Sequence, residues 1–268
     1  MDLNSHFKTQ SQKIDAALLA YLPKKTERVS QLYEAMRYAV LQGGKRIRPI
    51  LLLEAARAVG GSEKNAMPAA CAVELIHSYS LVHDDLPCMD DDAERRGQAS
   101  CHVKFGEVTA LLAGDALLTL AFETISQTKN PEAVRLLAAA SGSQGMVGGQ
   151  ALDMEFQNKS ADLPTLEYIN THKSGSLIAV SLRLGALLGG GTRKEIEALY
   201  RYGKFAGLLF QIVDDMLDGQ GYAKMLGLSE TRKKASDTAA KAKKELLIFG
   251  KRVATLNAIT DFILERKH

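Results

Sequence analysis

Apolar residues recur along most of the chain at spacings of three and four positions, the periodicity of amphipathic helices. Short alternating runs of β-branched residues, which would indicate strands, are scarce. The helical stretches are separated at Leu22-Pro23, Val59-Gly60-Gly61, Lys129-Asn130-Pro131, Asp162-Leu163-Pro164 and Gly189-Gly190-Gly191. None of these breaks resembles an interdomain linker. We therefore predict an all-α fold in a single domain, residues 1–268.

The end of the chain has a different character from the rest. From Ser229 onward, charged residues are interleaved with apolar ones, which predicts amphipathic helices on the outside of a helical bundle. The apolar positions are Leu246, Leu247, Ile248, Ile259, Phe262 and Ile263.

Composition limits the possible functions and compartments. A chain of 268 residues with 46% hydrophobic content can bury a large core. Its net charge of +3 is too small to indicate a nucleic-acid partner. The three cysteines form no CxxC pair, which argues against a disulfide framework or a zinc site and favours the reducing cytoplasm. No stretch approaches the roughly 20 apolar residues that span a bilayer, so we expect no membrane span.

Two aspartate clusters, each following an apolar helical stretch, carry the strongest functional signal. Pro87 disfavours helical geometry at Leu86, which places Asp84 and Asp85 in the last turn of a helix, at the negative end of its dipole. Carboxylates gathered there repel one another unless cations neutralise them, and hard cations with oxygen ligands fit best. The clusters are Asp84, Asp85 and Asp90–Asp92, and Asp214, Asp215 and Asp218. We predict two metal-binding walls.

Helical spacing groups other side chains with these acids. Residues three or four apart share a helix face, so two sets line up: His77, Ser80 and Asp84, and Gln211, Asp214, Asp215 and Asp218. The other histidines are interpreted separately: His83 and His102 as structural, with His172 left open.

Basic residues near the first cluster indicate phosphate. Lys45 and Arg48 follow Gly43-Gly44, a pair that permits close backbone approach, and Arg95-Arg96 follow the first acidic cluster. We expect Arg46 to point outward while its neighbours point inward. Acids and bases together predict divalent cations, Mg²⁺ in particular, that bridge the carboxylates to a diphosphate.

Nucleotide-binding motifs do not account for this phosphate signal. Neither GxxxxGK[ST] nor GxGxxG occurs in the chain. The Gly-rich segment 142–149 fits close helix packing at least as well as it fits a phosphate loop.

Five motifs together resemble the trans-prenyl diphosphate synthases, particularly the bacterial farnesyl diphosphate synthases. They are GGKRIRP, ELIHSYSLVHDDLPCMDDDAERRG, GQALDM, HKSGSL and FQIVDDMLD, in family order between Gly43 and Asp218. The resemblance implies a helical bundle around a deep central cavity, with the two aspartate motifs facing each other across its mouth, and a homodimer. It also implies condensation of isopentenyl diphosphate with dimethylallyl or geranyl diphosphate.

The resemblance also implies the role of each matched residue. Three Mg²⁺ ions, with Mn²⁺ as a substitute, would be held by Asp84, Asp90 and Asp214, and supported by Asp85, Asp215 and Asp218. Lys45, Arg48, His77 and Arg96 would bind isopentenyl diphosphate, Arg95 and Lys173 the allylic diphosphate, and Ser174 and Gln211 would line the path of the allylic cation. The residues expected to act in catalysis are Asp84, Asp85, Asp90, Lys173, Gln211 and Asp214.

Product length can be predicted from the helix that ends at Asp84. Tyr79 and Ser80 lie about 6 to 8 Å before Asp84 along the helix axis, where an aromatic ring would block a longer chain. Together with the two extra residues between Asp85 and Asp90, this resembles the farnesyl-producing pattern and predicts a fifteen-carbon product. The alternatives are a geranylgeranyl diphosphate synthase, a terpene cyclase, or a non-catalytic subunit of a heteromeric prenyl synthase.

One segment departs from the family pattern. After Asp218 the family runs through a flexible stretch with a lysine that caps the allylic diphosphate, whereas here Gly219-Gln220-Gly221 leads directly into the next helix. Lys224 is not in register with that lysine. We hypothesise that the protein carries a mobile loop that this sequence omits, which an intact mass of 29.1 kDa would reject.

Overall fold

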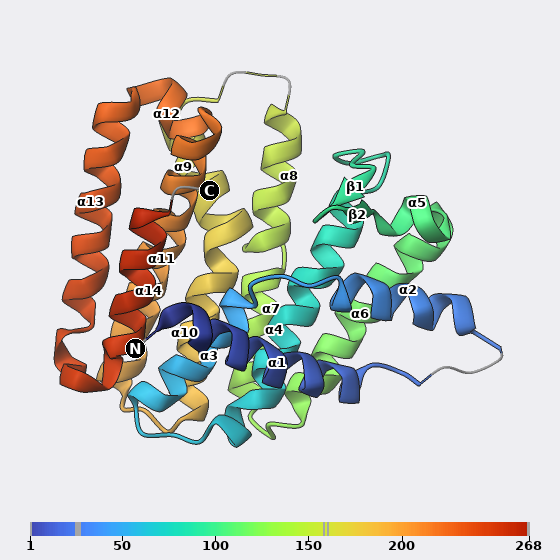
Figure 1. Cartoon of the computed structure of the whole chain (residues 1–268), viewed down its shortest axis with the longest axis horizontal. Helices are drawn as coiled ribbons and strands as arrows, with labels where there is room; N and C mark the ends of the chain where they lie inside the picture. The colour runs from blue at the N-terminus through green and yellow to red at the C-terminus, as the bar shows by residue number, and fades with distance from the viewer. Residues whose placement is uncertain (1, 25–27, 158, 160, 267–268) are drawn as a thin grey trace. The chain divides into compact units, whose positions relative to one another are not determined.

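The structure is a computed structural model that describes residues 2–24, 28–157, 159 and 161–266, and it is helical almost throughout (Figure 1). The prediction of an all-α fold is confirmed. Among these residues the strands amount to one small hairpin, in which β1 (Glu94–Arg95) pairs antiparallel with β2 (Gln98–Ala99). Arg96 and Gly97 both have positive φ angles, of 55° and 75°, as a two-residue hairpin turn requires. This hairpin was not predicted.

The described chain separates into two compact units. The first comprises Met1–Ile50 and Met67–Val134, and the second comprises Leu51–Ala66 and Arg135–His268. The divisions fall within the helices α3 (Ile47–Ala58), α4 (Glu63–Asp84) and α7 (Pro131–Ser141). The single-domain organisation stays a prediction.

Most of α4 forms the core of the first unit. From Ala69 to Ile76 every residue of this helix is buried, because the segment consists of small and aliphatic side chains with Glu74 as its one charged residue. Near the end of α4 the ring of His83 fills the space where a side chain at Gly114 of α6 would lie. The other helices of this unit are α1 (Leu3–Tyr21), α2 (Ser30–Leu41), α5 (Cys101–Phe105) and α6 (Glu107–Ser126).

The long helix α11 (Arg193–Asp218) organises the second unit. It packs against α10 (Ser176–Leu188), α13 (Leu228–Glu245) and α14 (Ala254–Glu265), which lie side by side with it (Figure 1). A capping box between Thr192 and Glu195 begins α11. The remaining elements are α8 (Met146–Phe156), α9 (Leu163–Ile169), the π-helix η1 (Asn170–Gly175), α12 (Gly221–Leu226) and the 3₁₀ segment η2 (Leu247–Val253).

All five predicted breaks between helices are confirmed. The C-terminal stretch is helical as predicted, but its apolar residues differ in burial. Leu246, Ile259 and Ile263 are buried, whereas Leu247 and Ile248 are 75% and 42% exposed in η2. The buried face of α13 consists of threonine and alanine instead of leucine and isoleucine.

One expectation about membranes needs correction. We expected no stretch with the length and apolar character of a membrane span, but α6 has both, with a mean hydropathy of 1.6 over its most apolar window. That window is 39% buried, and its Ala113 and Leu117 side chains are fully buried. A core helix of a soluble protein meets the same criterion, so α6 is weak evidence for membrane insertion.

Candidate functional site

The first aspartate motif forms a tight turn at the end of α4. The helix ends at Asp84, as Pro87 predicts. The backbone N–H of Asp90 donates to the carbonyl oxygen of Asp84 at 2.8 Å, and the N–H of Asp91 donates to the carbonyl of Leu86 at 3.2 Å. The turn therefore returns Asp90 to the helix end, so that the half-buried Asp84 and Asp90 belong to one small region of the first unit.

Asp85 lies inside this turn and is only 2% exposed. Its carboxylate accepts a hydrogen bond from Nε of Arg95 at 2.6 Å, and Arg95 also reaches Asp92 at 3.2 Å. Burial raises the pKa of the Asp85 carboxyl, while the bond to Arg95 acts in the opposite direction. Asp85, predicted to bind the metal, is thus paired with Arg95, predicted to bind the allylic diphosphate.

Arg48, His77 and Arg96, also in the first unit, lie close enough for the arginine charges to affect the pKa values of Arg48 and His77. Burial lowers the pKa of Arg48, and Arg96 lowers it further, while Glu74 opposes both effects. The Nε atom of Arg48 is buried without a hydrogen-bond partner among the described residues. Burial, followed by the charges of Arg48 and Arg96, holds the pKa of His77 well below its usual value, so the imidazole is neutral at physiological pH. We call Arg48 and Arg96 the cationic group, whose charges act on the neutral His77.

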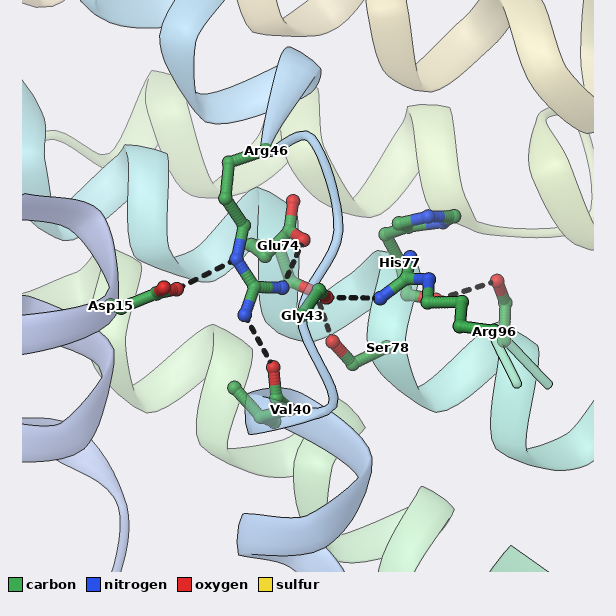
Figure 2. A network of polar contacts seen from close by, with 9 residues as sticks. Asp15, Val40, Gly43, Arg46, Glu74, His77, Ser78 and Arg96 are labelled. Carbon is green, nitrogen blue, oxygen red and sulfur yellow. Dashed lines mark hydrogen bonds and ion pairs between the residues drawn. The ribbon is translucent and has the colours of Figure 1, made fainter. Parts of the chain in front are cut away.

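The Gly43-Gly44 turn holds one member of this group in place. Arg96 donates to the carbonyl oxygen of Gly43 (Figure 2). Gly44 has a φ of 124°, and a Cβ there would lie 2.7 Å from Nη1 of Arg96. Glycine is therefore needed at this position, and the close approach predicted for the pair is confirmed, with Arg96 as the neighbour. Lys45, the next residue, is exposed.

The expectation for Arg46 is wrong. We expected it to point outward, but it is 3% exposed and forms ion pairs with Asp15 and Glu74 (Figure 2). The physical reason is the buried Glu74 of α4, whose carboxylate requires a counter-ion.

The predicted chain-length residues lie just before the first motif. Tyr79 is 6% exposed and its ring meets that of His83 edge-on, with centroids 5.8 Å apart. Burial and the charge of Asp84 raise the pKa of Tyr79 to about 12. The half-buried Ser80 donates its hydroxyl to the His77 carbonyl at 3.0 Å.

The two histidines predicted as structural are held by local contacts. His83 Nε2 lies 3.0 Å from the Leu111 carbonyl oxygen, and Nδ1 of His102 lies 3.1 Å from the hydroxyl of Ser100. Both fit a structural role. His172, which was left open, contacts the Tyr168 carbonyl at 2.8 Å and stacks on the Tyr168 ring.

In the second unit, Lys173 lies in the π-helix η1. Such single-turn distortions are frequent at functional sites. The Lys173 ammonium group lies 2.6 Å from a carboxylate oxygen of Asp153 in α8. Gly149, four residues before Asp153, contacts the Lys173 backbone and leaves no room for a side chain, which supports close packing for this part of the Gly-rich segment. Asp153 was not predicted, although its four-residue spacing from Gly149 in GGQALDM was available.

The second aspartate motif is on α11, so its predicted helical conformation is confirmed, while the shared face of its acids stays a prediction. The helix ends at Asp218, and Gly219 follows in the left-handed conformation. Asp215 accepts a hydrogen bond from the Tyr222 N–H at 2.8 Å; burial raises its pKa, and the nearby acids raise it further. Asp214 pairs with Arg266, a contact that the sequence pattern did not indicate. Gln211 and Ser174 are half-buried in the same unit.

The carboxylates of the two aspartate motifs are suitable ligands for a hard divalent cation that also binds substrate phosphates. In the part of the chain that the structure describes, no group of three or more His, Cys, Asp or Glu side chains is placed to hold a metal ion. Mg²⁺ retains several waters and uses one or two carboxylates plus substrate phosphates, so the pair Asp84 and Asp90 fits it in chemical type. The two motifs belong to different units, and their facing arrangement stays a prediction.

Comparisons with known proteins agree on one family. The family model described as Polyprenyl synthetase matches residues 29–249. The farnesyl diphosphate synthase of Geobacillus stearothermophilus is 46% identical over 226 residues, which cover 81% of this chain and 76% of that protein. The chloroplastic geranylgeranyl pyrophosphate synthase of Capsicum annuum is 45% identical over 263 residues, covering 88% of this chain and 71% of that protein.

A solved structure is similar over nearly the whole chain. The apo structure of an FPP/GFPP synthase from Zymomonas mobilis has a TM-score of 0.93 at 37% sequence identity. The match covers 98% of this chain and 99% of that one.

Proposed function

We propose that this chain, which belongs to the polyprenyl synthetase family and is a prenyltransferase, makes farnesyl diphosphate. In this reaction isopentenyl diphosphate condenses with dimethylallyl diphosphate and then with geranyl diphosphate. The family membership rests on the match over residues 29–249 and on relatives that share more than two-fifths of the aligned residues. The substrates and the product are proposals.

The cationic group is the observation that carries the proposal. Arg48 is buried and lies close enough to Arg96 for that second positive charge to lower the pKa of Arg48 further, and its Nε has no partner among the described residues. A diphosphate would add negative charge beside the two arginines and an acceptor oxygen for the unpartnered Nε of Arg48. The neutral His77 can donate one ring N–H to the same anion. Isopentenyl diphosphate is the proposed ligand, with Lys45 as a further contact.

The allylic diphosphate is proposed to bind Arg95 and Lys173. Each cation is paired with a carboxylate, Asp85 or Asp153, at 2.6 Å, so it is already oriented and charged. An incoming diphosphate would replace part of each contact with a charge-assisted hydrogen bond of the same kind. These pairings therefore support anion binding by both side chains.

The carboxylates that would hold Mg²⁺, or Mn²⁺ in its place, are Asp84, Asp90 and Asp214, with Asp85, Asp215 and Asp218 in support. When bound, the metal supplies Lewis-acid stabilisation of negative charge on the diphosphate. Asp215 is held by the Tyr222 N–H and Asp85 by Arg95, so these two acids are fixed in position by the protein.

The proposed reaction balances without a redox partner. The carbon–oxygen bond of the allylic diphosphate breaks, and the diphosphate leaves with the bonding electrons. The double bond of isopentenyl diphosphate attacks the allylic carbon to form the new carbon–carbon bond, and the released diphosphate takes the proton that is lost. Arg95 and Lys173 stabilise the developing negative charge, and Ser174 and Gln211 are proposed to line the path of the allylic cation.

Tyr79 favours a fifteen-carbon product. It is buried in α4, five positions before Asp84, where its ring would stop a tail that grows along the helix. Geranylgeranyl diphosphate is the second candidate, because relatives of similar identity carry either product in their names.

Product analysis tests the proposal. Full-length protein, verified by intact mass, is incubated with Mg²⁺, isopentenyl diphosphate and dimethylallyl or geranyl diphosphate, and the dephosphorylated products are identified by chain length. Farnesol is expected. Mainly geranylgeraniol would overturn the product assignment and retain the reaction class, whereas no product would favour a non-catalytic subunit.

We also propose that the protein is a homodimer. Along α6 and the neighbouring α5, the large apolar side chains of Val103, Val108, Leu111 and Leu112 are 47 to 73% exposed. Several exposed large apolar side chains on neighbouring helices are typical of a protein–protein interface, and a second copy of the chain could bury them by twofold symmetry.

A further inference from the structure

We propose that the buried ion pair between Arg46 and Glu74 positions the loop that binds isopentenyl diphosphate. The pair would act as a positioning device, without touching the substrate. This inference rests on the proposed function, because it assigns a cause to the placement of Lys45 and Arg48.

Arg46 is held by three acceptors (Figure 2). Its Nε donates to Asp15 at 2.7 Å, Nη1 donates to Glu74 at 2.8 Å, and Nη2 donates to the Val40 carbonyl at 2.6 Å. Arg46 is 3% exposed and Glu74 is 2% exposed. The pair joins α2 and the following loop to the central helix α4 of the same unit, and the planar guanidinium fixes the geometry of all three contacts.

The backbone of the loop requires such an anchor. Gly43, Gly44 and Arg46 have φ angles of 86°, 124° and 48°. A non-glycine residue with positive φ is disfavoured and persists where its surroundings determine it. The three hydrogen bonds of the Arg46 side chain hold its backbone in this conformation. Lys45 directly precedes Arg46 and Arg48 lies two residues after it, so fixing the Arg46 backbone also fixes where these two side chains leave the chain.

Glu74 serves the same loop electrostatically. Its negative charge raises the pKa of both Arg48 and Arg96, against the effect of burial. The Glu74 carboxylate accepts a hydrogen bond from Arg46, and the Ser78 hydroxyl donates to the backbone carbonyl of Glu74 at 2.8 Å. Glu74 thus offsets the charge of the cationic group from a buried position, and the Nε of Arg48, which has no partner among the described residues, remains a donor for an anion.

The test is Glu74→Gln in the full chain, which removes the charge and keeps the size of the side chain. We expect the KM for isopentenyl diphosphate to rise about tenfold or more, because the variant removes the buried counter-charge of Arg46, leaves only the part-exposed Asp15 as its ion-pair partner among the described residues, and loosens the loop. The KM for geranyl diphosphate should stay within about twofold of the wild-type value. Calorimetric binding of isopentenyl diphosphate should weaken in parallel.

Glu54→Gln is the matched control. Glu54 is also a buried acid, 5% exposed, and it pairs with Arg57 in the second unit. This variant should lose stability while keeping the KM for both substrates. Asp15→Asn should raise the KM for isopentenyl diphosphate less than Glu74→Gln, because the Asp15 side chain is 42% exposed.

The possible outcomes separate the two claims. An equal rise in both KM values, in step with a lower melting temperature, would show that the pair is only structural and would overturn the inference. Wild-type protein that binds isopentenyl diphosphate without transferring it would overturn the proposed function. The ratio of the wild-type and Glu74→Gln affinities for isopentenyl diphosphate would still test the role of the Arg46–Glu74 pair. If Glu74→Gln does not fold, Arg46→Lys retains the charge without the planar fork and should show the same selective loss.

Discussion

Several side chains predicted to bind ligands are already paired with opposite charges of the protein. Arg95 contacts Asp85, Lys173 contacts Asp153 and Asp214 contacts Arg266. Half-buried charges are costly without partners, and these pairs orient each side chain before a ligand arrives. Binding of a substrate or a metal ion must therefore break these ion pairs within the protein. The binding affinity then reflects the difference between the contacts made with the ligand and the ion pairs that are lost.

At the residue scale, Tyr79→Ala tests the proposed limit on product length. Removing the ring opens space before Asp84, so we expect products of twenty or more carbons from a variant that is less stable by about 3 kcal/mol. The measurement is chromatography of the dephosphorylated products. Tyr79→Phe is the control and should retain fifteen carbons, since it keeps the ring. Unchanged chain length in Tyr79→Ala would show that this ring is not the limit.

Single residues differ in how far the sequence predicts them. Asp84 could be placed at a helix end because Pro87, three positions away, determines the local backbone. Arg46 could not be placed, because its direction depends on Asp15 and Glu74, which lie 31 and 28 positions away in the chain. Asp153 and Arg266 escaped notice for the same reason, since their partners are 20 and 52 positions away.

At the element scale, helices and their breaks were predictable because glycine, proline and apolar spacing act locally. The hairpin β1–β2, the π-helix η1 and the 3₁₀ segment η2 were not, since short or distorted elements depend on neighbouring packing. The π-helix illustrates this dependence: it lies where Gly149 of α8 meets the Lys173 backbone. These irregular elements carry Arg95 and Lys173, two of the predicted substrate-binding residues.

Helix α6 carries the prediction about assembly. Leu111→Glu places a charge among the exposed apolar side chains of α6, so we expect the dimer to dissociate at micromolar concentration. Sedimentation measures this as a mass that falls to the 29.1 kDa of one chain. Leu247→Glu, at a residue 75% exposed in η2, is the control and should remain dimeric. A monomeric wild type, or a dimeric Leu111→Glu, would contradict the proposed interface.

At the scale of the whole molecule, each unit carries one aspartate motif, whereas the predicted phosphate-binding cations lie in the first unit except for Lys173. The connection after Asp218 is short in the structure, where the Gln220 N–H donates to the Asp215 carbonyl at 3.1 Å before α12 begins. The mobile loop expected at this point stays a prediction that intact mass decides. Without a capping lysine, Arg95 and Lys173 are the cations proposed for the allylic diphosphate.

The central claim is that two diphosphate substrates are joined, and pyrophosphate release tests it most directly. Release from geranyl diphosphate is measured with and without isopentenyl diphosphate, in Mg²⁺ and after chelation with EDTA. The account predicts release only when both substrates and the metal are present, in a one-to-one ratio with new farnesyl product. Release from geranyl diphosphate alone would indicate a cyclase, and no release from protein of verified mass would contradict the account.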